Sequence, residues 1–107
     1  MGVNLIEVTK DNFEKVKKDN AKVVIDCWAE WCGPCRMIAP VVEKLAGEHS
    51  GKVVFGKMDC DSNPELVKRF RIMAIPTLLF FKDGEVVDQI VGVVPKEDIE
   101  EMIKKHY

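Results

Sequence analysis

Two cysteines stand three positions apart in this chain, within the run Trp31-Cys32-Gly33-Pro34-Cys35. The run follows an apolar segment and opens a pattern that is typical of a long helix. An i, i+3 spacing places both sulfur atoms on one side of the first helical turn, close enough to form a disulfide. The free N–H groups and the dipole at a helix start favour the thiolate of Cys32. Pro34 suits a first turn and restricts the loop.

These residues predict thiol–disulfide exchange. The thiolate of Cys32 attacks a target disulfide to form a mixed disulfide, and Cys35 then attacks Cys32 and releases the reduced target. Cys35 must first lose its proton, and Asp26 is the candidate base, because burial in an apolar strand raises the pKa of a carboxyl group. From pattern alone, Asp26 is either buried in this way or solvated at a strand end. Lys57 either pairs with Asp26 or is an exposed lysine at a sheet edge.

A Cys-x-x-Cys pair is also half of a zinc site, which is the main alternative for these cysteines. Zinc usually takes four ligands, and His49 and His106 lack the spacing of a ligand pair. We therefore expect no metal and no bound cofactor, since the dithiol is itself a redox centre. The other cysteines, Cys27 and Cys60, adjoin apolar segments, and we expect each to be a small buried hydrophobe.

Length and composition predict one domain that spans residues 1–107. Apolar residues make up 47% of the chain, enough to fill one core, and the net charge of -2 excludes the basic footprint of a nucleic-acid binder. No segment is long and apolar enough to span a bilayer, and the first ten residues lack the pattern of a signal peptide. We expect a soluble cytoplasmic protein that binds neither nucleic acid nor membrane.

Hydrophobic periodicity predicts alternating strands and helices, the pattern of an α/β fold. The predicted strands are Leu5–Val8, Val23–Ala29, Val53–Met58, Thr77–Phe81 and Glu85–Val91. The predicted helices are residues 10–18 with Thr9 as N-cap, Gly33–His49 with a kink at Pro40, a short helix that Asn63-Pro64 begins, and Pro95–His106.

Two of these segments define the sheet. Val23–Ala29 is apolar on both faces except at Asp26, so we expect a central strand. Asp83-Gly84 is a strong hairpin signal, which makes the last two strands antiparallel and the sheet mixed.

The active-site run resembles that of the thioredoxin family, and the resemblance extends over almost the whole chain. The matching features are Asp26, Trp28, Ala29, Trp31 to Cys35, Pro40, Lys57, Ile75-Pro76-Thr77, Lys82-Asp83-Gly84 and Gly92. The resemblance implies the thioredoxin fold, a single domain with a central mixed five-stranded sheet flanked by four helices. It also implies disulfide-containing client proteins, a thioredoxin reductase as electron donor and a monomeric protein.

The resemblance further implies a cis peptide bond between Ile75 and Pro76, beside the dithiol. The backbone of Ile75 would then be free to bind an extended substrate as an added strand. The implied substrate-binding surface consists of Trp31, Gly33, Pro34, Ile75, Pro76, Gly92 and Val93. Without the resemblance, each of these residues would be assigned an ordinary role in a turn or in the core.

Some positions depart from the common family pattern. Arg36 replaces the more usual lysine and keeps its positive charge, Cys27 occupies a place that is often aromatic, and Cys60 is an added cysteine. Pro95 stands where a capping serine or threonine is frequent, which affects only the first turn of the last helix. None of these changes is expected to alter the chemistry of the dithiol.

Two alternatives to a reductant remain. One is an isomerase-like oxidant. However, the two residues between the cysteines are Gly33 and Pro34, a pair typical of the reductants, whereas histidine is common between the cysteines of the oxidants. Thioredoxins in general have reduction potentials of about −270 mV, and protein disulfide isomerase has one of about −180 mV. For the two-electron couple, this difference corresponds to roughly 4 kcal/mol. The other is a binding subunit without enzymatic activity, against which the intact dithiol argues.

Overall fold

The computed structural model describes residues 4–107. Its elements in chain order are β1 (Leu5–Glu7), α1 (Phe13–Asp19), β2 (Lys22–Trp28), α2 (Gly33–Glu48), β3 (Val54–Asp59), α3 (Pro64–Arg69), β4 (Thr77–Lys82), β5 (Glu85–Val91) and α4 (Lys96–His106).

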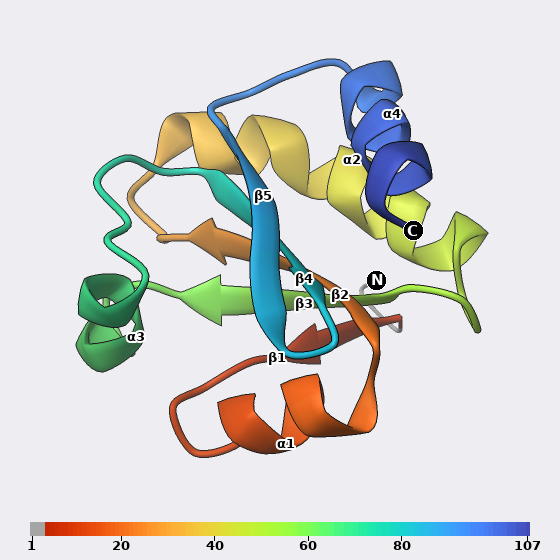
Figure 1. The fold of residues 1–107 in the computed structure, drawn as a ribbon. Helices are drawn as coiled ribbons and strands as arrows, with labels where there is room; N and C mark the ends of the chain where they lie inside the picture. The colour runs from red at the N-terminus through yellow and green to blue at the C-terminus, as the bar shows by residue number, and fades with distance from the viewer. Residues whose placement is uncertain (1–3) are drawn as a thin grey trace.

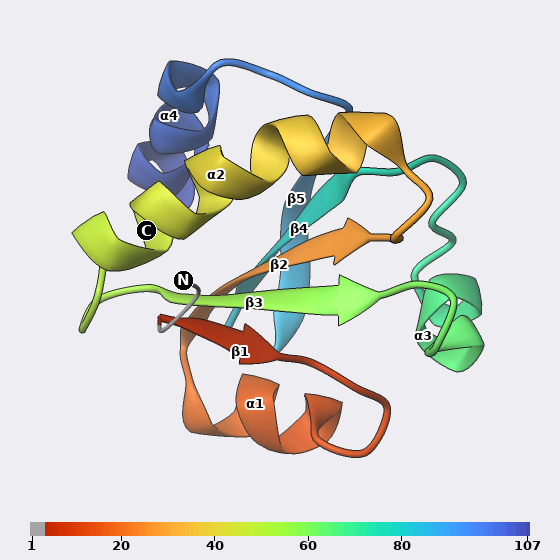
Figure 2. The ribbon, with the colours of Figure 1, turned by 180° about the vertical axis from the view of Figure 1, so that it is seen from behind.

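The five strands form one mixed sheet in the order β1-β3-β2-β4-β5. β1 and β2 run parallel to β3, while β4 runs antiparallel to both β2 and β5. α2 and α4 cover one face of the sheet, and α1 and α3 lie on the other (Figures 1 and 2). This arrangement confirms the predicted mixed sheet with four flanking helices.

Each face of the sheet packs on its own core. Successive side chains of a strand point to opposite faces, so Val24 joins the core under α2 and α4 while Val23 and Ile25 join the core on the side of α1 and α3. Asp26 follows the same alternation and lies on the face of Val24. The carboxyl group therefore points toward α2, the helix that carries the dithiol.

β2 is the central strand that the sequence predicted. It pairs with β3 on one side and with β4 on the other, and Val23 to Cys27 are all buried. Since both edges are paired, β2 is held in place over its whole length. The chain leaves it at Trp28 and enters α2 within a few residues, so the start of α2 has a fixed position above the sheet.

The prediction for the start of α1 was wrong: the helix begins at Phe13 rather than near residue 10. The Thr9 hydroxyl does accept a hydrogen bond from the Asp11 N–H (3.2 Å), but this caps only a turn. The reason is Asn12, whose side chain accepts a hydrogen bond from the Thr9 N–H (2.8 Å) and donates to the Glu7 carbonyl (2.8 Å). These bonds hold the segment as a turn.

Asn63 does precede α3, but its side chain does not cap that helix. Its oxygen accepts from the Lys10 N–H (2.9 Å), and its amide donates to the Asp59 carbonyl (2.9 Å). The buried amide therefore ties together the segments that follow β1 and β3.

The other boundaries differ from the prediction by one residue. β1 ends before Val8, β2 begins and ends one residue earlier, and β3 begins and ends one residue later. α2 ends at Glu48, β4 extends to Lys82, and α4 begins after Pro95.

The predicted hairpin between β4 and β5 is confirmed. Asp83 and Gly84 both have left-handed backbone angles, with φ of 52° and 86°. A two-residue turn of this kind matches the twist of the strands that it joins.

Candidate active site

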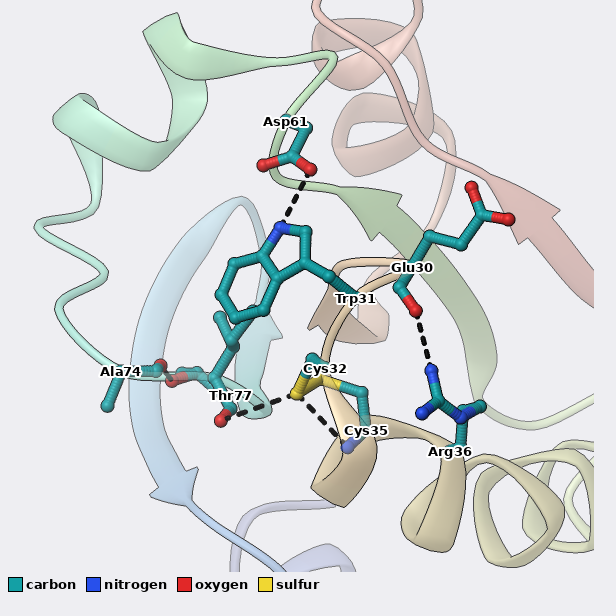
Figure 3. The surroundings of a disulfide bond; sticks show 9 residues. Glu30, Trp31, Cys32, Cys35, Arg36, Asp61, Ala74 and Thr77 are labelled. Atoms are coloured by element: carbon teal, nitrogen blue, oxygen red, sulfur yellow. Dashed lines mark hydrogen bonds between the residues drawn. A yellow bond between two sulfur atoms is a disulfide. The ribbon is translucent and has the colours of Figure 1, made fainter.

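The dithiol lies where the loop after β2 enters α2. Cys32 is the N-cap residue of α2, and Gly33 and Pro34 form the start of its first turn. Cys32 and Cys35 are joined in a disulfide with their Cα atoms 5.3 Å apart (Figure 3). The Cys35 N–H donates a hydrogen bond to the Cys32 sulfur at 3.2 Å. One of the free N–H groups of the helix start is thus directed at the sulfur that would carry negative charge after reduction.

The loop before β4 meets the dithiol from another part of the chain. The Ile75–Pro76 peptide bond is cis, as the family resemblance implied. The Ile75 carbonyl oxygen lies 3.8 Å from the Cys32 sulfur. The Thr77 hydroxyl donates to the Ala74 carbonyl (2.6 Å), and the Gly92 N–H donates to the Pro76 carbonyl (2.8 Å). Among residues 4–107, the Ile75 N–H has no backbone acceptor.

Several apolar side chains in the segments that carry the dithiol and the cis proline, or follow Gly92, are exposed. Trp31 is 69% exposed, and its indole N–H donates to the Asp61 carboxylate at 2.9 Å (Figure 3). Val93 is 45% exposed and follows Gly92, which has a left-handed φ of 91°. Two further exposed residues are Met37 in α2 and Met73 in the loop before Ile75. The sequence analysis missed Met73 and Asp61, because neither belongs to a local motif.

Asp26 lies below the dithiol with a side chain that is 5% exposed. Its Oδ1 atom is buried and has no hydrogen-bond partner among residues 4–107. A cavity of about 340 Å³ is lined by Asp26, Trp28, Cys35 and Lys57, among others. Burial raises the pKa of Asp26 to about 7, and the charge of Lys57 acts in the opposite direction. Asp26 is therefore a buried carboxyl group and not a solvated one at a strand end.

Lys57 lies opposite Asp26 in the register of β2 and β3. β3 runs between β1 and β2, so Lys57 is not at a sheet edge. Its ammonium group lies 5.1 Å from the centre of the Trp28 ring and borders the cavity that holds Asp26. The strand pairing thus places the positive charge of an exposed lysine beside the buried carboxyl group.

Cys27 and Cys60 stand apart from the dithiol. Both pack in the core on the α1 and α3 side of the sheet, Cys27 fully buried and Cys60 half-buried. Burial raises the pKa of both thiols, that of Cys60 to about 11. Neither forms a reactive thiolate near neutral pH. Within residues 4–107, no group of three or more histidine, cysteine or acidic side chains is placed to hold a metal, and no helix is long and apolar enough to cross a membrane.

Comparison with known proteins gives the same family as the motif. A sequence model of the thioredoxin family matches residues 4–105. The chain belongs to the thioredoxin family. A thioredoxin from Staphylococcus haemolyticus is 50% identical over 102 residues, covering 95% of this chain and 97% of the relative. One from Staphylococcus aureus is 45% identical over the same shares of both chains.

A solved structure of a mutant thioredoxin from Halobacterium salinarum matches with a TM-score of 0.86. The sequences are 34% identical, and the match covers 95% of this chain and 88% of that chain. Members of this family are disulfide oxidoreductases, and Cys32 and Cys35 form the Cys-x-x-Cys pair of this chain. The chain is accordingly a dithiol–disulfide oxidoreductase.

The buried carboxyl group predicts how stability depends on pH. The pKa of Asp26 is about 7 in the folded protein and 3.8 as its reference value, so between these pH values the folded state holds a proton that the unfolded state has lost. Stability should therefore fall as pH rises from about 4 to about 7, by up to roughly 4 kcal/mol at about 1.4 kcal/mol per unit, and then level off.

Asp26→Asn should abolish this fall in stability with pH. The free energy of unfolding of the variant should therefore increase relative to that of the parent protein as pH rises. Urea unfolding of both proteins at several pH values measures the effect. Asp11→Asn, in the turn before α1, is the matched control for loss of a carboxylate on the surface and should follow the parent. A difference in stability between Asp26→Asn and the parent protein that is the same at pH 4 and pH 8 would contradict the burial of Asp26 as an acid.

Proposed function

We propose that this chain reduces protein disulfides, with Cys32 as the nucleophile and Cys35 as the resolving thiol. The observation that carries the proposal is the hydrogen bond from the Cys35 N–H to the Cys32 sulfur at the start of α2. A thiolate at Cys32 is favoured there by the helix dipole and by this N–H. Both sulfur-bearing residues are buried in the oxidised protein, Cys32 being 4% and Cys35 3% exposed, so the assignment rests on the position of Cys32 as the N-cap of α2.

Reduction of a client proceeds in two exchanges. The Cys32 thiolate forms a bond to one sulfur of the client disulfide, and the other client sulfur leaves as a thiolate that takes up a proton. The Cys35 thiolate then forms a bond to the Cys32 sulfur, and the remaining client sulfur leaves. The client gains two electrons and two protons, and the protein ends with the Cys32–Cys35 disulfide.

Asp26 serves as the base for the second exchange in this proposal. Its ionised carboxylate accepts the proton of Cys35, with which it shares the cavity beneath the first turn of α2. A pKa of about 7 keeps both forms of the carboxyl group populated near neutral pH, as a base in a repeated cycle requires. The role of Lys57 is to favour the ionised form by its charge.

Clients dock on the surface around the dithiol. The open N–H of Ile75 beside the cis Pro76 supports a client segment that adds as a short extended strand. Trp31 and Val93 supply exposed apolar area, Gly33 and Pro34 lie between the two cysteines, and the Gly92 N–H donates a hydrogen bond to the Pro76 carbonyl.

The partners follow from the family. Members of the family receive electrons from a thioredoxin reductase and pass them to disulfide-containing proteins, and we propose the same for this chain, acting as a cytoplasmic monomer. Sedimentation of the reduced protein tests the monomer. The Gly33-Pro34 pair supports a reductant over an isomerase-like oxidant, and the intact dithiol supports an enzyme over a binding subunit.

Trapping separates an oxidoreductase from a binding subunit. Cys35→Ser removes the resolving thiol, so mixed disulfides between Cys32 and clients should accumulate and be released by dithiothreitol. Non-reducing gels followed by mass spectrometry of the adducts provide the measurement. The double variant with Cys32→Ser is the matched control and should trap nothing. Equal capture by both variants would contradict a nucleophilic Cys32.

Kinetics test Asp26 as the base. In Asp26→Asn, the second exchange should slow by about ten-fold or more near pH 7 because Cys35 must lose its proton to solvent. The deficit should shrink as pH rises to 9, where hydroxide replaces the base. Single-turnover rates of client release over this range provide the measurement. Rates equal to those of the parent throughout would exclude the role.

A further inference from the structure

Arg36 has a contact that the sequence did not indicate. It follows Cys35 in the first turns of α2, and its Nη1 atom donates a hydrogen bond to the Glu30 carbonyl oxygen at 2.6 Å (Figure 3). Glu30 belongs to the loop that leads from β2 to Cys32. The bond therefore joins the helix that carries Cys35 to the loop that carries Cys32.

The path of the side chain explains how it reaches the loop. Helical side chains point back toward the helix start, and the Arg36 guanidinium passes over Gly33, with Nη2 4.0 Å from where a Cβ atom would stand. A Cβ atom at that distance would make only an ordinary van der Waals contact, so the path does not depend on the glycine. The guanidinium carries several donors in a rigid plane, which suits it to hold a carbonyl while it keeps its charge in solvent.

Two further hydrogen bonds involve Cys32 and the dithiol. The Cys32 N–H donates to the Ala29 carbonyl at 3.1 Å, within the loop itself. The Cys35 N–H donates to the Cys32 sulfur at 3.2 Å, across to the helix. In the oxidised protein the disulfide adds a covalent link between the two parts. That link is absent while Cys32 is bonded to a client, so the short backbone through Gly33 and Pro34 and the non-covalent contacts then hold the two sulfurs near each other.

We propose that Arg36 is a positioning residue for the second exchange, holding the Cys32 loop against α2 while the client is attached. This inference rests on the proposed function. In the step concerned, the Cys35 thiolate forms a bond to the Cys32 sulfur, the bond between Cys32 and the client breaks, and the client sulfur leaves as a thiolate. Arg36 touches none of these sulfurs and acts through the position of the loop.

Any test must distinguish the effect of the positive charge of Arg36 from the effect of its hydrogen bond to the loop. Arg36 borders the cavity of Asp26, together with Glu30 from the loop, Glu43 from α2 and Lys57 from β3. Arg36→Lys keeps the positive charge, but lysine is shorter and ends in a strongly hydrated ammonium that holds a carbonyl less firmly. Arg36→Gln removes the charge as well. Lys44→Gln, on an exposed turn of the same helix, removes a positive charge without any contact to the loop.

The experiment uses the reduced full chain and dithiobis(nitrobenzoate) as the disulfide. Cys32 releases one thionitrobenzoate in a phase proportional to reagent concentration, and Cys35 releases the second in a phase independent of it. Arg36→Lys should slow the second phase about five-fold, the effect of one hydrogen bond, and leave the first phase unchanged. Arg36→Gln should slow the second phase at least as much, and also the first, because the reagent is an anion.

The second phase of Lys44→Gln should have the same rate as that of the parent protein. In Arg36→Lys, the apparent pKa of the second phase should be unchanged. Unchanged second phases in both Arg36 variants would overturn the inference. An equal slowing by Lys44→Gln, or a shifted pKa in place of a slower rate, would also overturn it, because charge would then be the cause. Loss of the second phase in the parent protein itself would instead contradict the proposed function. Circular dichroism verifies that each variant is folded.

Discussion

The contact between the Cys35 N–H and the Cys32 sulfur depends on where β2 ends and where α2 begins. β2 is paired along both edges and packed on both faces, so its end has a fixed position in the sheet. The chain then has only a short loop before Cys32 becomes the N-cap of α2. The free N–H groups of a helix start need acceptors, and here the sulfur of Cys32 is one of them. The reactive sulfur is thus held by the same geometry that starts the helix.

The buried carboxyl group has a cost that the rest of the fold must offset. Asp26 interrupts a strand that is otherwise apolar, and its Oδ1 atom has no partner within residues 4–107. Burial of a charged carboxylate without partners is unfavourable, and a folding requirement alone would select an apolar residue there. Asp26 and Cys35 line one cavity, and the proposed role of Asp26 as a base gives a chemical reason for this cost. Two extensive cores, one on each face of the sheet, supply the stability that permits it.

Much of the fold follows from local sequence, while most of the site does not. The central strand, the long helix and the Asp83-Gly84 turn each have a signal within a few residues, and the structure agrees with all three. A capping residue type can bond elsewhere: Thr9 caps only a turn, and Asn63 precedes α3 as expected but binds the backbone of Lys10, far away in sequence. The contacts of Trp31 with Asp61 and of Ile75 with Cys32 likewise join distant segments, which periodicity cannot reveal. The cis bond before Pro76 was implied by the family resemblance and not by its neighbours.

The central claim is that the dithiol acts as a reductant, and its reduction potential tests this claim most directly. The Cys32–Cys35 pair can be equilibrated with glutathione or dithiothreitol, with insulin reduction measured alongside. The account predicts a potential well below that of the glutathione couple, near the family figure of about −270 mV, together with turnover of insulin. A potential at or above the glutathione couple, near the isomerase figure of about −180 mV, would contradict it and indicate an oxidising member of the same fold.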